Sequence, residues 1–444
     1  MRKSILQATL LLMVLAMAVS ACAPAATPAV PAATQAPAAT SAPAATAAPT
    51  TAPATQAPAA APTSAPISIP DIQQGKFNVA VVLIGYSNDG GWSQAHTEGA
   101  KWMTTQDPTI NVHFVEAVNP GTDAENVMRA LARKGFDLII GTTFEYGSTM
   151  AALADEFPKT SWLHISGYQT NGTNYGNLFG SMEDMKYIGG MVAGARAKAD
   201  GNTKLGYVAP WPLPEVIRLG NAFMLGAKVT CPECTMEVRW INTWYDPDKE
   251  KQAAQSLLDA GVDIVLIGSD TPGPLVAAAN ANKWALTYDY INSCSPAPKN
   301  CLGTEYWNWG PVELNIVKQI RAGTWKPGNV WLDADSGLVG FYGFMPGQTP
   351  QPGVPDSVKP MVQAKIADMV AGKFTVQDVF KGPIKDNTGK VVIQAGQKIT
   401  PEDLFGIDAA TIKSMNLTGR TACAVCMNWL ADGIQGTIPP MPSQ

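Results

Sequence analysis

The sequence predicts an α/β protein of two similar lobes, each with a parallel β-sheet covered by helices on both faces. Short β-branched runs alternate with longer helical patterns, which is typical of parallel sheets. This alternation starts twice, at "FNVAVVLIG" (residues 77–85) and at "KLGYVA" (residues 204–209). The roughly 370 residues that carry it are also too many for one ordinary core, so two lobes are expected.

The helix boundaries are visible at two places. Thr122 and Glu125 form a capping box before a helix that should stop at Gly135. Asp246 and Pro247 supply a cap and a first-turn proline for a later helix. A β-hairpin is expected around residues 387–389 of "GPIKDNTGKVVIQAG". The strands expected from β-branched runs are residues 78–84, 112–116, 138–141, 162–166, 205–208, 237–241, 264–267 and 285–288.

The first 22 residues have the form of an export signal. A positive start precedes "ILQATLLLMVLAMAV", which is too short to span a membrane comfortably. It ends in "VSAC", which is similar to a bacterial lipobox with cleavage before Cys22 and a lipid on its sulfur. Ordinary signal-peptidase cleavage is the alternative. We expect lipidation, which would hold the protein on the extracytoplasmic face of a cell membrane without a transmembrane helix.

Residues 23–70 form an expected tether. This stretch is almost entirely Ala, Pro, Thr, Ser and Gln, so it cannot bury a core. Its reach runs from about 40 Å as a coil to about 140 Å when extended. We interpret it as a spacer across a cell-wall layer.

The boundaries of the lobes follow from where the alternation restarts. The first lobe is predicted at residues 71–197, with residues 302–325 returning to it. The second is predicted at residues 198–301, with residues 326–407 returning to it. The remaining tail, residues 408–444, carries a pair of cysteines.

Charge and cysteine content exclude several classes of protein. Only 15% of the residues are charged, the net charge is -5, and there is no basic block, so nucleic-acid binding is not expected. Besides Cys22, six cysteines fall into three local pairs. In an exported chain these pairs predict short-loop disulfides, although two CxxC pairs also leave a Cys₄ zinc site open. The pairs are Cys231 with Cys234, Cys294 with Cys301, and Cys423 with Cys426.

The loops that follow the expected strands indicate a ligand site. Ligands of open parallel sheets bind beyond the carboxyl ends of the strands. Nearly every such loop supplies an aromatic residue, and none contains Lys or Arg. Because phosphate and carboxylate ligands usually recruit cationic side chains, this set favours a flat, neutral or weakly basic ligand. The acids spread among the loops are Asp89, Glu145, Glu215, Asp246, Asp270, Asp289 and Glu305.

The tryptophans divide by position. Any single tryptophan can be a packing residue, because its ring buries a large area. Those inside helix or strand patterns are assigned to the core: Trp102, Trp162, Trp240 and Trp284. Those in strand-end loops should converge on one cleft: Trp92, Trp211, Trp244, Trp307 and Trp309. Asp246 is expected to act only as a helix cap, and Glu215 suits a first helical turn with or without a ligand.

The sequence contains few signatures of a catalytic site. His96 lies in the first expected helix, whereas His113 and His164 lie in expected strands, and they form no metal-spaced pair. No nucleophile elbow, P-loop or dinucleotide fingerprint follows a strand. We therefore predict a binding protein rather than an enzyme, with no cofactor and no resident metal.

Several long segments resemble one family. "DGGWSQAHTEGAKW", "GFDLIIGTTFEY", "GGMVAGARA", "GYVAPWPLPEVIRLGNAFMLGAK", "NTWYDPDKEKQAAQSLLDAGVDIV", "YWNWG" and "GPIKDNTGKV" are similar to the basic membrane protein (BMP) lipoproteins. These are substrate-binding components of ABC transporters, related to the purine-nucleoside receptor group. The resemblance runs from about residue 77 to about residue 407. It implies a type I periplasmic-binding-protein fold, with two Rossmann-like lobes joined by hinge strands.

The resemblance also implies a ligand. A purine base or nucleoside would be held by stacked aromatic rings and by acidic side chains, with ABC permease subunits as partners and the protein as a monomer. Where the nucleoside-binding branch has Phe in its first motif, this chain has Trp with a nearby His, and it has "WNWG" in place of another segment. A sugar-binding protein and a sensor lipoprotein without transport remain alternatives. The expected ligand contacts are Trp92, Phe144, Glu145, Tyr146, Trp211, Trp244, Asp270, Asp289 and Trp309.

Overall fold

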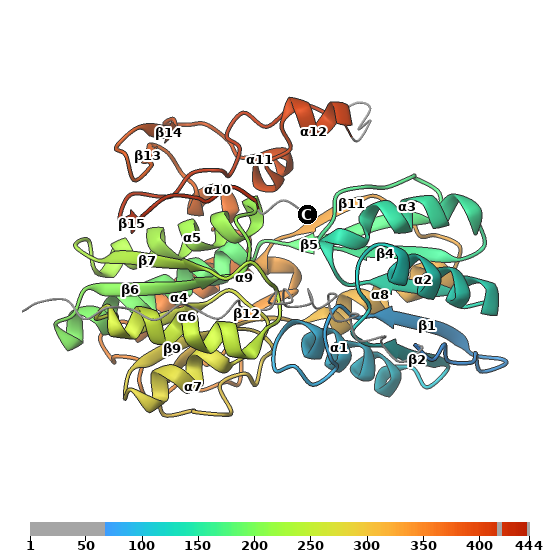
Figure 1. Cartoon of the computed structure of the whole chain (residues 1–444), viewed down its shortest axis with the longest axis horizontal. Coiled ribbons are helices and arrows are strands. Elements are labelled where there is room, and N and C mark those ends of the chain that lie inside the picture. Colours follow the sequence, from blue (N-terminus) through green and yellow to red (C-terminus); the bar gives the residue numbers. More distant parts are fainter. Residues whose placement is uncertain (1–66, 415–419, 442–444) are drawn as a thin grey trace, which may run out of the picture. The chain divides into compact units, whose positions relative to one another are not determined.

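The computed structural model describes residues 67–414 and 420–441. The expected export signal, the lipidation site Cys22 and the tether up to residue 66 lie outside the described residues. The described chain forms two α/β lobes, which Figure 1 shows side by side as a blue-green and a yellow-green body.

The first lobe has a parallel sheet in the order β11-β5-β4-β3-β1-β2. Alternate residues of β1 point to opposite faces: Val79 and Val81 pack under α1, whereas Ala80 and Val82 pack under α2 and α3. Both faces are covered, so β1 is almost wholly buried. The strands are β1 (Phe77–Val82), β2 (Ile110–Val115), β3 (Leu138–Gly141), β4 (Ser161–Ile165), β5 (Tyr175–Gly180) and β11 (Asn329–Leu332); the helices are α1 (Trp92–Gln106), α2 (Thr122–Lys134), α3 (Gly147–Glu156) and α8 (Trp309–Arg321), with a 3₁₀ turn η1 (Phe144–Tyr146).

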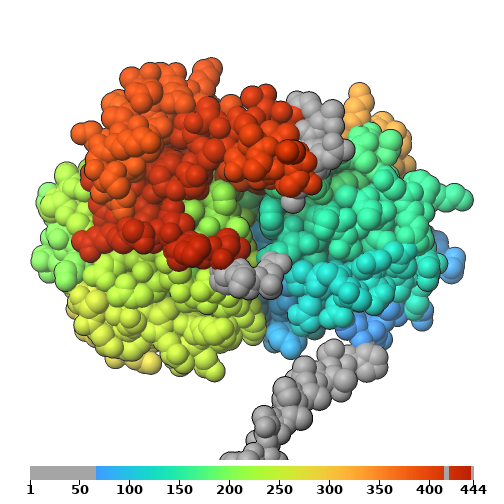
Figure 2. Space-filling model, turned by 45° about the horizontal axis from the view of Figure 1, so that its top comes forward, coloured from blue at the N-terminus to red at the C-terminus, as the bar shows by residue number. Residues whose placement is uncertain are grey.

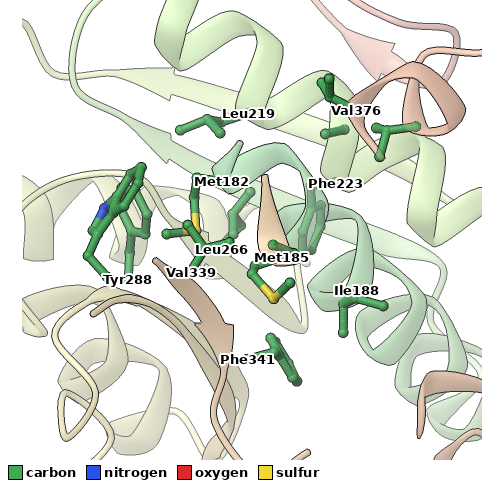
Figure 3. Packing of buried hydrophobic residues seen from close by; sticks show 14 of the residues in the cluster. Met182, Met185, Ile188, Leu219, Phe223, Leu266, Tyr288, Val339, Phe341 and Val376 are labelled. Carbon is green, nitrogen blue, oxygen red and sulfur yellow. The ribbon is translucent and has the colours of Figure 1, made fainter. Parts of the chain in front are cut away.

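The second lobe repeats this plan in the order β12-β10-β9-β8-β6-β7-β15, in which only β12 runs antiparallel to its neighbour. Helices α4 and α5 cover one face and α6 and α7 cover the other. Figure 3 shows Met185 of α4 and Phe223 of α5 packed towards Leu266 of β8. The elements are α4 (Met182–Asp200), β6 (Lys204–Ala209), α5 (Pro214–Thr230), β7 (Thr235–Trp240), α6 (Pro247–Asp259), β8 (Ile264–Ile267), α7 (Gly273–Asn280), β9 (Trp284–Asp289), β10 (Cys301–Trp307), β12 (Val339–Phe341), α9 (Lys359–Val370) and α10 (Val376–Val379).

The chain crosses between the lobes three times, and two crossings differ from the predicted boundaries. It crosses at Ser181, at Asn308 and over residues 333–338, which contain the 3₁₀ turn η2 (Ala334–Ser336). Helix α4 therefore belongs to the second lobe rather than the first. The returning segment is 309–332 rather than 302–325.

The reason for the first difference is the close packing of two helices. A Cβ atom on Gly190 of α4 would lie 2.0 Å from the Phe223 carbonyl oxygen of α5, so the two backbones nearly touch. Glycine at this position lets α4 dock on the second lobe. Similarly, β10 pairs with β9 of the second sheet and leaves it only at Asn308.

One of the two predicted helix caps is confirmed. The Asp246 side chain accepts a hydrogen bond from the Lys249 amide at the start of α6. At α2 the prediction is wrong, because Gly121 is the N-cap and Thr122, already in the helix, makes no capping bond. The left-handed stop at Gly135 is present.

The C-terminal extension, defined as residues 372–414 and 420–441, packs on the second lobe. The predicted hairpin is confirmed as β13 (Ile384–Lys385) and β14 (Val391–Ile393). Two short helices follow, α11 (Pro401–Phe405) and α12 (Ala409–Ser414), and then β15 (Ile434–Gln435) adds a parallel strand beside β7.

All three predicted cysteine pairs form disulfides: Cys231–Cys234, Cys294–Cys301 and Cys423–Cys426. Among the helices of the described segments, none combines the length and the apolar character that a membrane span requires.

Candidate ligand-binding site

A cavity lies between the lobes at the carboxyl ends of both sheets, as expected for open parallel sheets. About 450 Å³ of space among its lining residues is not filled by protein atoms, and part of this space is open to solvent. None of its lining residues is Lys or Arg. The first lobe contributes Ile84, Trp92, Thr142, Thr143, Phe144 and Ser166; the second contributes Glu215, Val216, Leu219, Trp244, Gly268, Asp270, Tyr288 and Asp289.

The lobes touch directly beside this cavity. A Cβ atom on Gly91 would lie 2.1 Å from the Asp270 carbonyl oxygen, and one on Gly90 would lie 2.7 Å from the Pro272 ring. The glycine pair before α1 therefore permits the two backbones to meet. Beside this contact the Trp244 indole donates a 2.8 Å hydrogen bond to Glu145. The structure thus describes the lobes in a closed arrangement.

Trp92 is both a cavity wall and a core residue. Its indole N–H donates a 2.6 Å hydrogen bond to the Thr142 carbonyl at the end of β3, so the ring is held in one orientation. Only 9% of Trp92 is exposed, and its ring meets those of His96, Trp307 and Trp309 edge-on. Asp89 fixes the preceding loop, because its carboxylate accepts bonds from the amides of residues 91, 93 and 94.

Two neighbouring residues at the end of β9 both face the cavity. Side chains along a strand normally alternate between faces, but Asp289 has a φ of 68°. This left-handed conformation allows Tyr288 and Asp289 to line the same space. The Asp289 Oδ1 atom accepts a bond from the Trp307 indole at 3.0 Å. The Asp289 Oδ2 atom and the Tyr288 hydroxyl are buried with no partner in the described chain, so a ligand can satisfy both.

Three carboxyl groups of the cavity have raised pKa values. Burial, reinforced by the nearby Asp289, raises the pKa of Asp270 well above its usual value. Burial also raises the pKa of Asp289, against the opposing effect of the Lys186 charge. For Glu215, burial raises the pKa to about 7. N–H donors from a ligand would favour the ionised form of these groups.

One cation lies behind the cavity wall rather than in the cavity. Lys186 is fully buried, pairs with Glu305 at 3.1 Å and donates to the Ile267 carbonyl at 3.0 Å. Its ammonium group lies 3.6 Å from the centre of the Tyr288 ring. Glu305, expected among the strand-end acids, is therefore used in a structural ion pair.

The structure separates the predicted contact residues into two groups. Those that line the cavity or bridge its rim are Trp92, Phe144, Glu145, Trp244, Asp270 and Asp289. Tyr146 lies elsewhere: it is fully buried under the sheet of the first lobe and its hydroxyl donates to the Val118 carbonyl. Trp211 is half-buried and Trp309 fully buried, and neither borders this cavity.

Trp309 belongs instead to a column of rings at the crossing between the lobes. Its indole stacks on His96 at 4.4 Å and on Trp307 at 4.8 Å, and Trp307 stacks in turn on Phe179 at 5.1 Å. His96 also faces Glu313 at 3.5 Å. The histidine therefore has a packing role.

The tryptophans assigned to the core behave differently from one another. Trp162 is fully buried, as predicted. Trp102 is 39% exposed on α1, which is contrary to the prediction. Trp240 and Trp284 are half-buried, and the Trp284 indole donates to Asp200 at 3.0 Å.

The cavity also contains residues that the sequence reasoning missed. Thr142, Thr143 and Ser166 follow β3 and β4, in loops where only the aromatic and acidic residues indicate a ligand site from sequence. Tyr288 lies within the strand predicted at residues 285–288, and the positive φ of Asp289 has no signature in the sequence. In the described ranges 67–414 and 420–441, no cluster of His, Cys, Asp and Glu has the arrangement of a metal site.

The protein has two α/β lobes with largely parallel sheets, three crossings between the lobes and a cavity closed between them. This arrangement defines the type I class of periplasmic solute-binding proteins. Residues 76–371 match the family model Bmp, described as ABC transporter substrate-binding protein PnrA-like. The chain belongs to this family, as the sequence predicted. It is therefore an extracytoplasmic substrate-binding protein of an ABC transporter and not an enzyme.

Two relatives are named for the ligands that they bind. A purine-binding protein of Brucella abortus is 32% identical over 338 residues, covering 75% of this chain and 91% of the relative. A candidate ABC transporter glucose-binding protein of Haloferax volcanii is 33% identical over 267 residues, covering 59% of this chain and 65% of the relative.

Solved structures agree on the fold. A solute-binding protein from Conexibacter woesei aligns with a TM-score of 0.55 at 23% identity, covering 68% of this chain and 99% of that one. One from Aeropyrum pernix aligns with a TM-score of 0.59 at 17% identity, covering 70% and 93%.

Proposed function

We propose that the cavity binds a purine base or nucleoside. The observation that carries this proposal is the lining itself, which combines aromatic side chains and carboxyl groups without a single Lys or Arg. Aromatic rings bind the flat faces of a purine, and base–aromatic stacking contributes about 1–3 kcal/mol per base. The Brucella relative, named as a purine-binding protein, supports the same ligand class.

The polar groups suit the edge of a purine. Asp289 keeps one oxygen without a partner beside the unpartnered Tyr288 hydroxyl. A purine edge presents N–H donors next to ring-nitrogen or carbonyl acceptors, so it can donate to Asp289 and accept from Tyr288. Asp270, only 5% exposed, offers a second acceptor on the same wall.

Trp92 is proposed to stack on the ligand, with Phe144 and Trp244 completing the aromatic wall. The hydrogen bond from Trp92 to Thr142 fixes the indole before a ligand arrives, which reduces the entropy lost on binding. The bond between Glu145 and Trp244 is proposed to hold the rim closed over the ligand.

The remaining features of the protein are proposed from its sequence. The chain is attached to the membrane by a lipid on Cys22, acts as a monomer and delivers its ligand to ABC permease subunits. The tether of residues 23–70 spaces the lobes from the membrane.

Sugar binding is the second candidate, because the Haloferax relative carries a glucose-binding name. Sugars also stack on tryptophan and bond to carboxylates. Isothermal titration of the purified protein with adenine, guanine, adenosine, guanosine and glucose separates the two. Tight binding of one purine compound with no glucose signal supports the proposal, and the reverse pattern rejects it.

A further inference from the structure

The C-terminal extension is firmly fixed to the second lobe. Its strand β15 pairs with β7, and the Asn221 side chain of α5 donates to the Trp429 carbonyl and accepts from the Ala431 amide, both at 2.8 Å. Arg218 of the same helix donates to the Leu404 carbonyl at 2.8 Å. Residues 372–441 nevertheless lie beyond the part of the chain that the family model matches.

The same extension also reaches the first lobe. The Phe405 ring, at the end of α11, lies 5.5 Å from the Tyr168 ring and 5.2 Å from the Trp331 ring. Arg420 donates to the Tyr168 carbonyl at 2.8 Å while it pairs with Glu402 at 3.1 Å. Figure 2 shows the orange-red extension resting on the second lobe and meeting the teal surface of the first.

These contacts lead directly to the cavity. The Tyr168 ring lies 5.8 Å from the ring of Phe144, a cavity-lining residue. On the other side, Gly406 packs so closely on Pro214 that a Cβ atom would lie 2.5 Å from the proline ring. Pro214 immediately precedes Glu215, which lines the cavity from the second lobe.

We propose that Phe405 and Arg420 are positioning residues for ligand binding. Acting through Tyr168, they hold the Phe144 wall of the first lobe against the second lobe and so favour the closed arrangement. The extension does not touch the ligand; it slows the opening that releases it. The inference rests on the proposed function only where the test measures dissociation of a purine. The contacts between the lobes do not depend on which ligand is bound.

The test compares Phe405→Ala and Arg420→Gln, which remove contacts with the first lobe, with matched changes that remove contacts with or within the second lobe. Phe374→Ala removes a half-buried ring that contacts Tyr187 and Lys365, and Arg196→Gln removes an arginine that pairs with Asp200. Each variant is measured for dissociation of the purine found by titration, by surface plasmon resonance. Spin labels at Lys159→Cys and Lys251→Cys, exposed positions on opposite lobes, report the distance between the lobes.

For Phe405→Ala the dissociation rate should rise about 10-fold with little change in the association rate, since two aromatic contacts are lost. Phe405→Leu should recover part of the effect, and the lobe distances in Phe405→Ala should shift to longer values. The inference is overturned if Phe405→Ala and Arg420→Gln both match their controls in dissociation rate and in lobe distance. If no purine binds at all, the proposed function fails, and the lobe distances alone then decide the inference.

Discussion

Replacing Gly91 with alanine should weaken ligand binding by keeping the lobes apart. The added Cβ atom would lie 2.1 Å from the Asp270 carbonyl oxygen, whereas real Cβ contacts essentially never fall below 3.0 Å. The two backbones must therefore separate by about 0.9 Å, since neither contact atom is a flexible side chain. A separation of the same size at the rim of the cavity would lengthen the hydrogen bond between Trp244 and Glu145 from 2.8 Å to about 3.7 Å, which breaks the bond.

The loss of that bond sets the expected size of the effect. Hydrogen bonds to charged groups contribute about 1.5–3 kcal/mol, so affinity should fall roughly 10- to 150-fold. Calorimetry with the purine identified by titration measures the loss of affinity, and urea unfolding of the ligand-free protein checks that the fold is intact. Gly328→Ala is the matched control, because nothing lies within 4 Å of its added methyl group. Equal affinity for Gly91→Ala and Gly328→Ala would refute the closed arrangement as the ligand-bound state.

Three further predictions use single substitutions. Trp92→Ala should weaken purine binding roughly 5- to 150-fold and, because Trp92 is also a core residue, lower the free energy of unfolding by about 3–5 kcal/mol; unchanged affinity in calorimetry would make Trp92 a packing residue only. Burial raises the pKa of Glu215 to about 7. The unfolded chain loses this proton at the lower, usual pKa, so the free energy of unfolding is highest below that pKa and falls as the pH rises through 7. Glu215→Gln should therefore raise the free energy of unfolding at pH 8 by up to about 3 kcal/mol and change it little at pH 4; denaturant unfolding at both pH values measures this, and equal effects at both would contradict it. Cys22→Ser should release the protein from membranes, which fractionation and mass spectrometry of the N-terminus can show; an unmodified Cys22 in the native protein would exclude the anchor.

The sequence predicted the lobes well because their signals are local. The β3 strand and the caps at Asp246 and Gly135 depend on a few adjacent residues, and each occurs as expected. The predicted boundary of the first lobe was wrong because α4 follows β5 in the ordinary strand–helix alternation of an α/β lobe. Only tertiary contacts, such as the close approach of Gly190 to Phe223, decide on which lobe it packs.

The site was predicted in part for the same reason. Trp92, Trp244 and Asp289 line the cavity, because topology alone brings these strand-end loops together; their contact with a ligand stays a prediction. Tyr146 and Trp309 are also in such loops, yet the direction of their side chains is set by a 3₁₀ turn and by a stack of rings. Neither feature has a sequence pattern, so position along the chain could not distinguish a cavity wall from a core residue.

Gly90 and Gly91 illustrate the difference between a local sequence pattern and a contact between the lobes. In the sequence this pair stands immediately before Trp92, the first residue of α1. In the structure the two glycines also meet Pro272 and Asp270 of the opposite lobe. An interlobe contact of this kind joins residues about 180 positions apart, and no local pattern could reveal it.

The proposal that the aromatic, carboxyl-lined cavity between the lobes captures a purine can be tested by direct binding. Titration calorimetry of the lobes with adenine, guanine, their nucleosides and glucose tests it most directly. We expect saturable one-to-one binding of at least one purine compound, weakened by Trp92→Ala and by Asp289→Asn, with no heat of binding from glucose. Tight glucose binding with no response to any purine would contradict it.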